Sequence, residues 1–107
     1  MGYVVVFVTC PDRETTQRIA EELIERKLAA CVNITTEINS VYFWQGNIEK
    51  DTEYLMIIKT SEELFEELET FIKNNHPYTV PEIIGIPIVK GSKEYLDWID
   101  QTVSREQ

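Results

Sequence analysis

The feature that most limits how this chain can fold is a pair of long β-patterned segments joined by one turn. The segments span residues 31–45 and 47–60, with the turn at residues 45–47. Each arm can run to about fourteen residues, whereas an ordinary strand has roughly five or six. A chain of 107 residues is too small to cover arms of that length. We therefore expect the far ends of the arms, which carry Tyr42 and Trp44, to contact another subunit.

Within the first arm, the alternation of apolar and aromatic residues predicts the face on which each side chain lies. Ile34, Ile38, Tyr42 and Trp44 share one parity. Because side chains alternate along a strand, we expect these four residues on one common face. The apolar centre of the second arm is residues 54–58.

The rest of the chain alternates between strand and helix patterns. Residues 3–9 form a continuous apolar run, which predicts a strand buried on both faces. The remaining expected elements are a helix over residues 13–27 capped by Asp12, a helix that begins at a capping box over residues 60–63 and ends near residue 75, a strand over residues 82–89, and a last helix capped by Ser92. Pro87 indicates that the last strand lies at an edge or carries a bulge.

This order, β-α-β-β-α-β followed by a helix, predicts an α+β protein of the ferredoxin-like class with one domain over residues 1–107. The sheet is expected to be antiparallel with its helices on one face. In a chain this small, the other face then needs cover. Folds of this class carry many functions, so function has to be argued from particular side chains.

Charge and cysteine content narrow the partners and the compartment. Ten basic and nineteen acidic residues give a net charge of -9, which disfavours nucleic acids and anionic membrane surfaces as partners. No segment approaches the roughly 18 apolar residues that span a bilayer. The apolar start of the chain lacks the basic region and cleavage site of a signal peptide. With only two cysteines no disulfide framework is expected, and we expect a cytoplasmic protein.

Familiar catalytic and cofactor motifs are absent from the sequence. It contains no Gly-rich phosphate loop, no G-x-S-x-G and no H-E-x-x-H. The loop after the first strand has the single cysteine Cys10, not the Cys-x-x-Cys of a copper-chaperone domain. An RNA-binding aromatic platform would need a basic setting, which this chain lacks. We therefore do not expect an enzyme.

The soft metal ligands of the chain are His76, its only histidine, and the cysteines Cys10 and Cys31. Imidazole and thiolate together suit a transition metal such as copper. They are few for a complete site within one subunit, but an oligomer brings several copies together. The alternatives are a histidine that only hydrogen-bonds within its loop and, for Cys31, a small buried side chain. Cys10, at the end of a strand, is expected to be exposed and reactive.

Two charged residues lie within apolar strand patterns. Lys59 directly follows the apolar residues 55–58, and Glu82 precedes the next apolar run. Charges in such positions are often paired or line a pocket. The alternatives are that Lys59 reaches solvent at a strand edge and that Glu82 begins an exposed strand. Tyr42 and Trp44 are interpreted as interface or core residues.

Several segments together resemble a known family. Residues 28–34 (LAACVNI), 40–48 (SVYFWQGNI), 58–60 (IKT), 76–83 (HPYTVPEI) and 91–99 are similar, in sequence and in order, to the CutA divalent-cation tolerance proteins. Each segment is short, but together they cover nearly the whole chain. The sequence is therefore interpreted as that of a CutA-type protein.

The resemblance implies a tight homotrimer of ferredoxin-like subunits, similar in architecture to the PII signalling trimers, which bind small molecules at clefts between subunits. It implies a role in tolerance of divalent metals, copper above all, and no established catalytic activity. A PII-type small-molecule-sensing trimer and a scaffold trimer for another protein stay open as alternatives. The residues implied are Tyr42, Trp44, Lys59, Tyr78 and Glu82 at the intersubunit cleft, and His76 and Cys31 as metal ligands.

Overall fold

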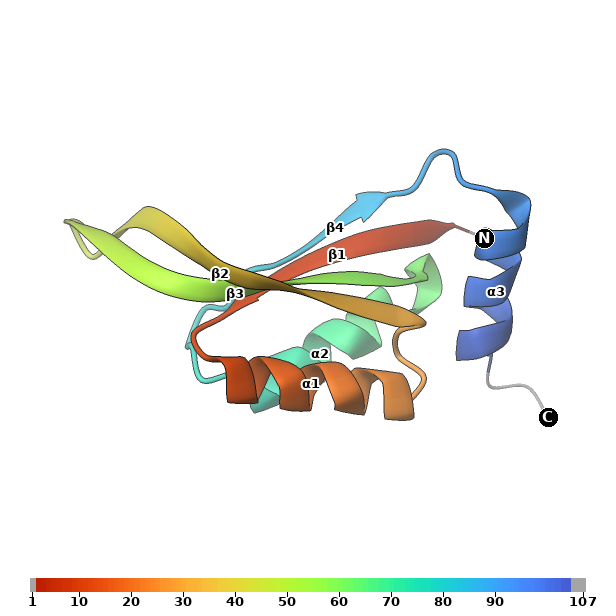
Figure 1. The fold of residues 1–107 in the computed structure, drawn as a ribbon, viewed down its shortest axis with the longest axis horizontal. Helices are drawn as coiled ribbons and strands as arrows, with labels where there is room; N and C mark the ends of the chain where they lie inside the picture. The colour runs from red at the N-terminus through yellow and green to blue at the C-terminus, as the bar shows by residue number, and fades with distance from the viewer. Residues whose placement is uncertain (1, 105–107) are drawn as a thin grey trace.

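One four-stranded antiparallel sheet organises the structure, a computed structural model that describes residues 2–104 (Figure 1). Three α-helices accompany the sheet within these residues, so the mixed α+β class is confirmed. None of these helices combines the length and the apolar character that crossing a membrane requires. In chain order the elements are β1 (Tyr3–Cys10), α1 (Arg13–Glu25), β2 (Cys31–Trp44), β3 (Asn47–Ser61), a 3₁₀ turn (Glu62–Leu64), α2 (Phe65–Asn75), β4 (Ile83–Pro87) and α3 (Lys93–Val103).

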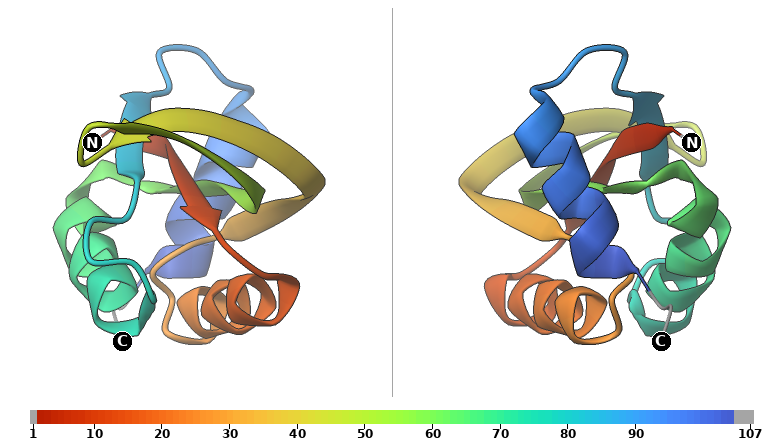
Figure 2. Two further views of the ribbon diagram at one scale, coloured as in Figure 1. Left: turned by 90° about the vertical axis from the view of Figure 1, so that its left-hand side faces the viewer. Right: turned by 90° about the vertical axis from the view of Figure 1, so that its right-hand side faces the viewer.

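The main core lies between the sheet and two of the helices. The strands follow the order β2-β3-β1-β4, and each neighbouring pair is antiparallel. α1 and α2 lie beneath one face of this sheet, whereas α3 lies at one end of it (Figure 1 and Figure 2). Alternate strand residues point toward α1 and α2. The largest buried side chains of this core are Val6, Val8, Ile19, Leu23, Met56, Ile58, Leu68 and Ile72.

Within the described part of the chain, no helix lies over the centre of the opposite face of the sheet (Figure 1). Side chains alternate along β1, and Val4, Val6 and Val8 point to the helices. Val5 and Phe7 therefore point to the opposite face, where they are only partly buried. Their partners in β4, Ile86 and Ile84, are each 49% exposed. The prediction that the first strand is buried on both faces is therefore wrong for a single subunit.

The long hairpin is confirmed. β2 has 14 residues and β3 has 15, and the hairpin extends well beyond the other two strands (Figure 1). Trp44 pairs with Asn47, so the turn consists of Gln45 and Gly46, with φ angles of 53° and 83°. Positive φ at both central residues gives a turn whose twist matches that of the two strands. Near the turn, Phe43 is 74% exposed.

A β-bulge in β2 reverses the faces of its outer half. Ile34 pairs with Met56, but beyond an irregularity at residues 35–36 Ile38 pairs with Glu53. Met56 and Glu53 are an odd number of residues apart in β3, so they point to opposite faces. The prediction that Ile34 shares a face with Ile38 and the aromatic residues near the turn is therefore wrong. One extra residue in a strand is enough to turn the rest of it over.

The helix caps predicted before the first and last helices are confirmed. Asp12 Oδ1 accepts a hydrogen bond from Thr15 N at 2.7 Å, and Ser92 Oγ accepts one from Tyr95 N at 3.1 Å. α1 ends two residues earlier than predicted, because Lys27 has a φ of 59° that no helix can continue through. β4 is shorter than predicted and lies at the edge of the sheet, as its proline indicated.

The capping box predicted over residues 60–63 is wrong. Thr60 and Ser61 are the last residues of β3, and Thr60 Oγ1 donates a hydrogen bond to the Leu28 carbonyl oxygen at 2.8 Å. A 3₁₀ turn follows, and the helix begins only at Phe65. Pairing with β1 and this side-chain bond therefore outweigh the local capping preference of the two hydroxyl residues.

Candidate functional site

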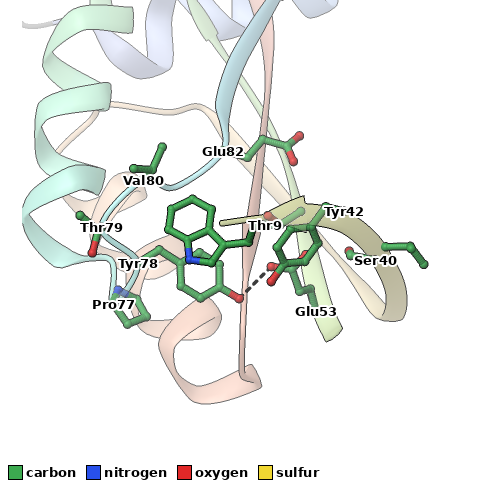
Figure 3. A pocket seen from close by; sticks show the side chains of 11 residues that line it. Thr9, Ser40, Tyr42, Glu53, Pro77, Tyr78, Thr79, Val80 and Glu82 are labelled. Carbon is green, nitrogen blue, oxygen red and sulfur yellow. Dashed lines mark hydrogen bonds between the residues drawn. The ribbon is translucent and has the colours of Figure 1, made fainter. Parts of the chain in front are cut away.

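A pocket of about 660 Å³ lies between the outer half of the hairpin and the loop that connects α2 to β4 (Figure 3). Its size falls in the range of roughly 300–1,000 Å³ found for small-molecule sites. The wall combines the end of β1, facing parts of β2 and β3, and the loop. The lining residues are Thr9, Ser40, Val41, Tyr42, Trp44, Glu53, Pro77, Tyr78, Thr79, Val80 and Glu82.

Most of the cleft residues implied by the family resemblance meet in this pocket. The hairpin and the loop are distant in sequence, so only the folded chain brings their side chains together. Lys59 does not line the pocket, and its Nζ instead donates a hydrogen bond to Asn33 Oδ1. The family resemblance implied five cleft residues, and four of them line the pocket: Tyr42, Trp44, Tyr78 and Glu82.

Glu53 is the charged pocket residue that sequence reasoning missed. Although charged, it is only 6% exposed, and its Oε2 accepts a hydrogen bond from the Tyr78 hydroxyl at 2.8 Å. A signal was present, because Glu53 shares its parity with Leu55 and Ile57 in the apolar centre of the second arm. Residues of one parity point to the same face of a strand, so Glu53 lies on the face that carries Leu55 and Ile57. In the structure this face continues into the pocket wall.

The two tyrosine hydroxyls of the pocket both donate to carboxylates. The Tyr78 hydroxyl donates to Glu53, and the Tyr42 hydroxyl donates to Asp51 (Figure 3 shows the first pair). Burial and then the bond to Glu53 raise the pKa of Tyr78 above its usual value. The bond to Asp51 raises the pKa of Tyr42 to about 12. Both phenols therefore stay neutral at physiological pH, and their protons are already engaged.

His76 anchors the pocket loop to β1. Its ring is 8% exposed, and Nε2 lies 2.7 Å from the Thr9 carbonyl oxygen, which can only accept. Nε2 therefore carries the proton, and Nδ1 accepts from Tyr78 N at 3.1 Å. Nε2 also lies 3.5 Å from Cys10 Sγ. The alternative of a histidine that only hydrogen-bonds within its loop holds for Nδ1 but not for Nε2, which contacts β1, and both ring nitrogens have partners.

The variant His76→Ala is expected to lower the free energy of unfolding by about 2–4 kcal/mol, because it leaves two largely buried backbone groups without partners. Urea denaturation at fixed protein concentration measures the change. The matched control is Asn74→Ala in the same segment, where the side chain is exposed and the change should stay within about 0.5 kcal/mol. Equal effects of the two variants would contradict the anchoring role.

The two cysteines differ in burial, and the prediction that Cys10 is exposed is wrong. Cys10 is 0% exposed, not exposed and reactive, because its side chain shares the parity of Val6 and Val8 and belongs to the core between the sheet and the helices. Burial raises the pKa of its thiol from 9.0 to about 11. This raised pKa favours the folded state below pH 9, and the contribution is lost as pH rises through about 11. Cys31 is partly exposed, and both thiols are free.

Alkylation with iodoacetamide at pH 8 is therefore expected to label Cys31 and to leave Cys10 at least about tenfold slower to react, because the thiolate is the reactive form. Mass spectrometry of the digested protein over time gives the two rates. In denaturant both sites should react at similar rates, which controls for local sequence. Faster labelling of Cys10 in the folded protein would show that its burial is wrong.

The two metal-ligand candidates lie at different ends of the sheet. Cys31 of β2 pairs with Lys59 of β3, whose Nζ lies 3.9 Å from Cys31 Sγ. Lys59 in turn pairs with Val5 of β1, so Cys31 lies level with Val5 across the sheet. His76 contacts Cys10, so the two sites are about 17 Å apart along β1. No group of three or more His, Cys, Asp or Glu residues in the described chain is placed to hold a metal ion. One subunit therefore does not bring His76 and Cys31 together.

Fold and pocket define a class: a small α+β protein with a four-stranded antiparallel sheet, an open sheet face and a pocket of small-molecule size. Residues 4–102 match the family described as CutA1 divalent ion tolerance protein. The chain belongs to this CutA family, as the sequence motifs indicated.

Curated relatives support the assignment. The divalent-cation tolerance protein CutA of Archaeoglobus fulgidus is 51% identical over 98 residues, which is 92% of this chain and 95% of the relative. The corresponding protein of Thermus thermophilus is 47% identical over 95 residues, 89% of this chain and 92% of the relative. The chloroplastic CutA protein of Arabidopsis thaliana is 48% identical over 96 residues, 90% of this chain, but the match spans only 53% of its length. The first two names describe tolerance proteins, and none of the three mentions an enzyme activity.

Solved structures agree with this fold. The crystal structure of CutA1 from Oryza sativa matches with a TM-score of 0.95 and 44% identity over 99% of this chain and 97% of that one. A structure from Archaeoglobus fulgidus, described as a periplasmic divalent cation tolerance protein, matches with a TM-score of 0.93 and 49% identity over 95% and 99% of the two chains.

Proposed function

We propose that this chain is one ferredoxin-like domain of a homotrimer that acts in tolerance of divalent cations, the role named for its relatives. The open sheet face carries the proposal of assembly, since Ile84 and Ile86 are exposed there beside the partly buried Val5 and Phe7. The outer hairpin also offers unpaired strand edges to a neighbour. Light scattering should report the mass of three chains, and a mass of one chain, 12.5 kDa, would contradict the trimer.

We further propose that the trimer binds a divalent metal ion, copper first, with His76 and Cys31 of different subunits among its ligands. Imidazole and thiolate are donors that suit copper. Titration with Cu(II) at physiological salt should show a saturable site, one per chain or per trimer, with a Kd near or below about 1 μM. Unchanged affinity in His76→Ala would remove His76 from the site. Weak, many-site binding that salt suppresses would show that the acidic surface alone attracts the metal.

A second candidate function is small-molecule sensing of the PII type. It is supported by a pocket of about 660 Å³ that combines Tyr42, Trp44, Tyr78 and Glu82. A ligand that binds only the folded protein must raise its melting temperature. A thermal-shift screen of organic cations, amino acids, nucleotides and organic acids therefore tests this function, and no shift with any of them would count against it.

We propose a cytoplasmic location for the protein. The free thiols of Cys10 and Cys31 support it, because a reducing compartment keeps cysteines unpaired. The names of relatives differ on this point, with chloroplastic and periplasmic proteins among them. Fractionation of the source cells with detection of the native protein tests the proposal, and recovery from another compartment would overturn it.

A further inference from the structure

The charge that lines the pocket is entirely negative. Glu53 and Glu82 are its charged residues, and no Lys, Arg or His is among the lining residues, all of which lie in the described part of the chain. Asp51 adds a third carboxylate close by, since the Tyr42 hydroxyl donates to it. Several carboxylates around one concave wall create a potential that attracts cations and repels anions.

Glu53 is a buried carboxylate that lacks a cationic partner. It is 6% exposed, and the ion pairs found among residues 2–104 join side chains along single helices and do not include it. Its hydrogen bond at 2.8 Å comes from a neutral donor, the Tyr78 hydroxyl. Buried carboxylates are normally paired with a positive charge, because burying an unpaired charge is unfavourable. The pocket is the side from which a positive charge can approach Glu53 (Figure 3).

Aromatic and apolar side chains form most of the remaining wall. Tyr42, Trp44 and Tyr78 line the pocket together with Val41 and Val80. The face of an aromatic ring attracts an organic cation, and an indole does so most strongly. Because the two phenol protons already go to carboxylates, these tyrosines offer ring surface and not free donors to a ligand. The wall therefore suits a ligand that is positively charged and carries apolar carbon.

A bare metal ion fits this pocket less well. The described residues contain no group of three or more metal-ligating side chains, so Glu53 and Glu82 are not part of such a cluster. A metal ion also gains nothing from aliphatic walls, whereas alkyl groups on a nitrogen cation would contact them. The volume of about 660 Å³ is likewise that of a site for an organic molecule.

We infer that this pocket binds a small organic cation, an ammonium group that bears alkyl carbons. The two lining glutamates face its charge, and the three aromatic rings contact its carbons. The inference rests on the small-molecule part of the proposed function and names the ligand class. It depends neither on copper binding nor on the identity of the metal ligands.

The test compares three compounds of nearly the same shape and different charge: choline, the neutral 3,3-dimethylbutan-1-ol and the anion 3,3-dimethylbutanoate. Each is titrated into the assembled protein at constant ionic strength. Fluorescence is read in a Trp98→Phe background, because Trp44 is then the only indole of the chain. Choline is expected to give a saturable change. The neutral alcohol should bind at least about tenfold more weakly, and the anion should not bind.

Two variants and a control locate the effect. Glu53→Gln removes the buried charge but keeps an acceptor for Tyr78, and it is expected to weaken choline binding at least about tenfold. Glu82→Gln changes an exposed residue, so it does not endanger folding, and it is expected to weaken binding about threefold. The control Glu25→Gln on α1 makes the same change in net charge at an exposed site outside the pocket and should leave binding unchanged.

Four results would overturn the inference. The first is no saturable binding of choline below about 10 mM, which corresponds to negligible specific affinity. The second is equal binding of choline and the neutral alcohol, and the third is an equal loss of choline binding in Glu53→Gln and Glu25→Gln. The fourth is preferential binding of the anion, which would overturn the cation class while leaving the pocket as a small-molecule site. Preferential anion binding would therefore reject the organic-cation class without rejecting the sensing function. The light-scattering mass and the copper titration test the trimer and the metal site independently of this experiment.

Discussion

Replacing Ile84 and Ile86 with glutamate is expected to convert the proposed trimer into single chains. Both side chains are 49% exposed on the open sheet face, where Ile84 pairs with Phe7 of β1 and Ile86 pairs with Val5. An interface over this face would bury two unpaired carboxylates per subunit, at a cost on the order of several kcal/mol each. Light scattering coupled to size exclusion should report 12.5 kDa for the variant, a third of the mass expected for the unmodified protein.

The matched control for this variant is Ile24→Glu. Ile24 is 40% exposed on α1, in the helix layer on the other side of the sheet, so this variant should keep the full mass. Far-ultraviolet circular dichroism of all variants verifies that they are folded. A double variant that keeps the mass of three chains would show that another surface holds the assembly together.

Ile19→Ala is expected to lower the free energy of unfolding by about 2–5 kcal/mol, the second large effect. Ile19 is 0% exposed in the core between α1 and the sheet. Its truncation removes buried carbon and leaves a cavity that the surrounding side chains fill only in part. The better helix propensity of alanine offsets about 0.4 kcal/mol of this loss. Urea denaturation measures the effect at fixed protein concentration, because the stability of the proposed trimer would depend on concentration.

Ile24→Ala provides the comparison within the same helix. The residue type and the deleted atoms are the same, but Ile24 is 40% exposed where Ile19 is 0% exposed. We expect a change below about 0.5 kcal/mol, since little buried surface is lost and helix propensity improves. Similar losses in both variants would mean that α1 does not present the described face to the sheet.

Much of the fold follows from local patterns. The caps at Asp12 and Ser92 and the hairpin with its turn at Gly46 were all predictable, because each depends on residues close together in sequence. The failed capping box at Thr60 shows the limit of such reasoning. A local preference for starting a helix was outweighed by strand pairing to β1, which sequence neighbours do not reveal.

The candidate site was predictable in composition but not in geometry. The resemblance to the CutA family identified Tyr78 and Glu82, which the structure places in the pocket wall. Glu53 escaped notice, because its shared parity with Leu55 and Ile57 predicts the face on which it lies but not how deeply the fold buries it there. Burial of Cys10 was missed because the core that encloses it is built from residues distant in sequence, among them its contact His76, which is 66 residues away.

By itself, the sequence determined the order of strands and helices, the long hairpin, the acidic surface and the family. These properties depend on composition, periodicity and short motifs, all of which act locally. Only the tertiary structure decided which side chains share a face beyond the bulge at residues 35–36, and which of them meet in the pocket. One unpaired residue in a strand reverses the direction of every side chain after it, and that register is set by a partner strand and not by neighbours along the chain.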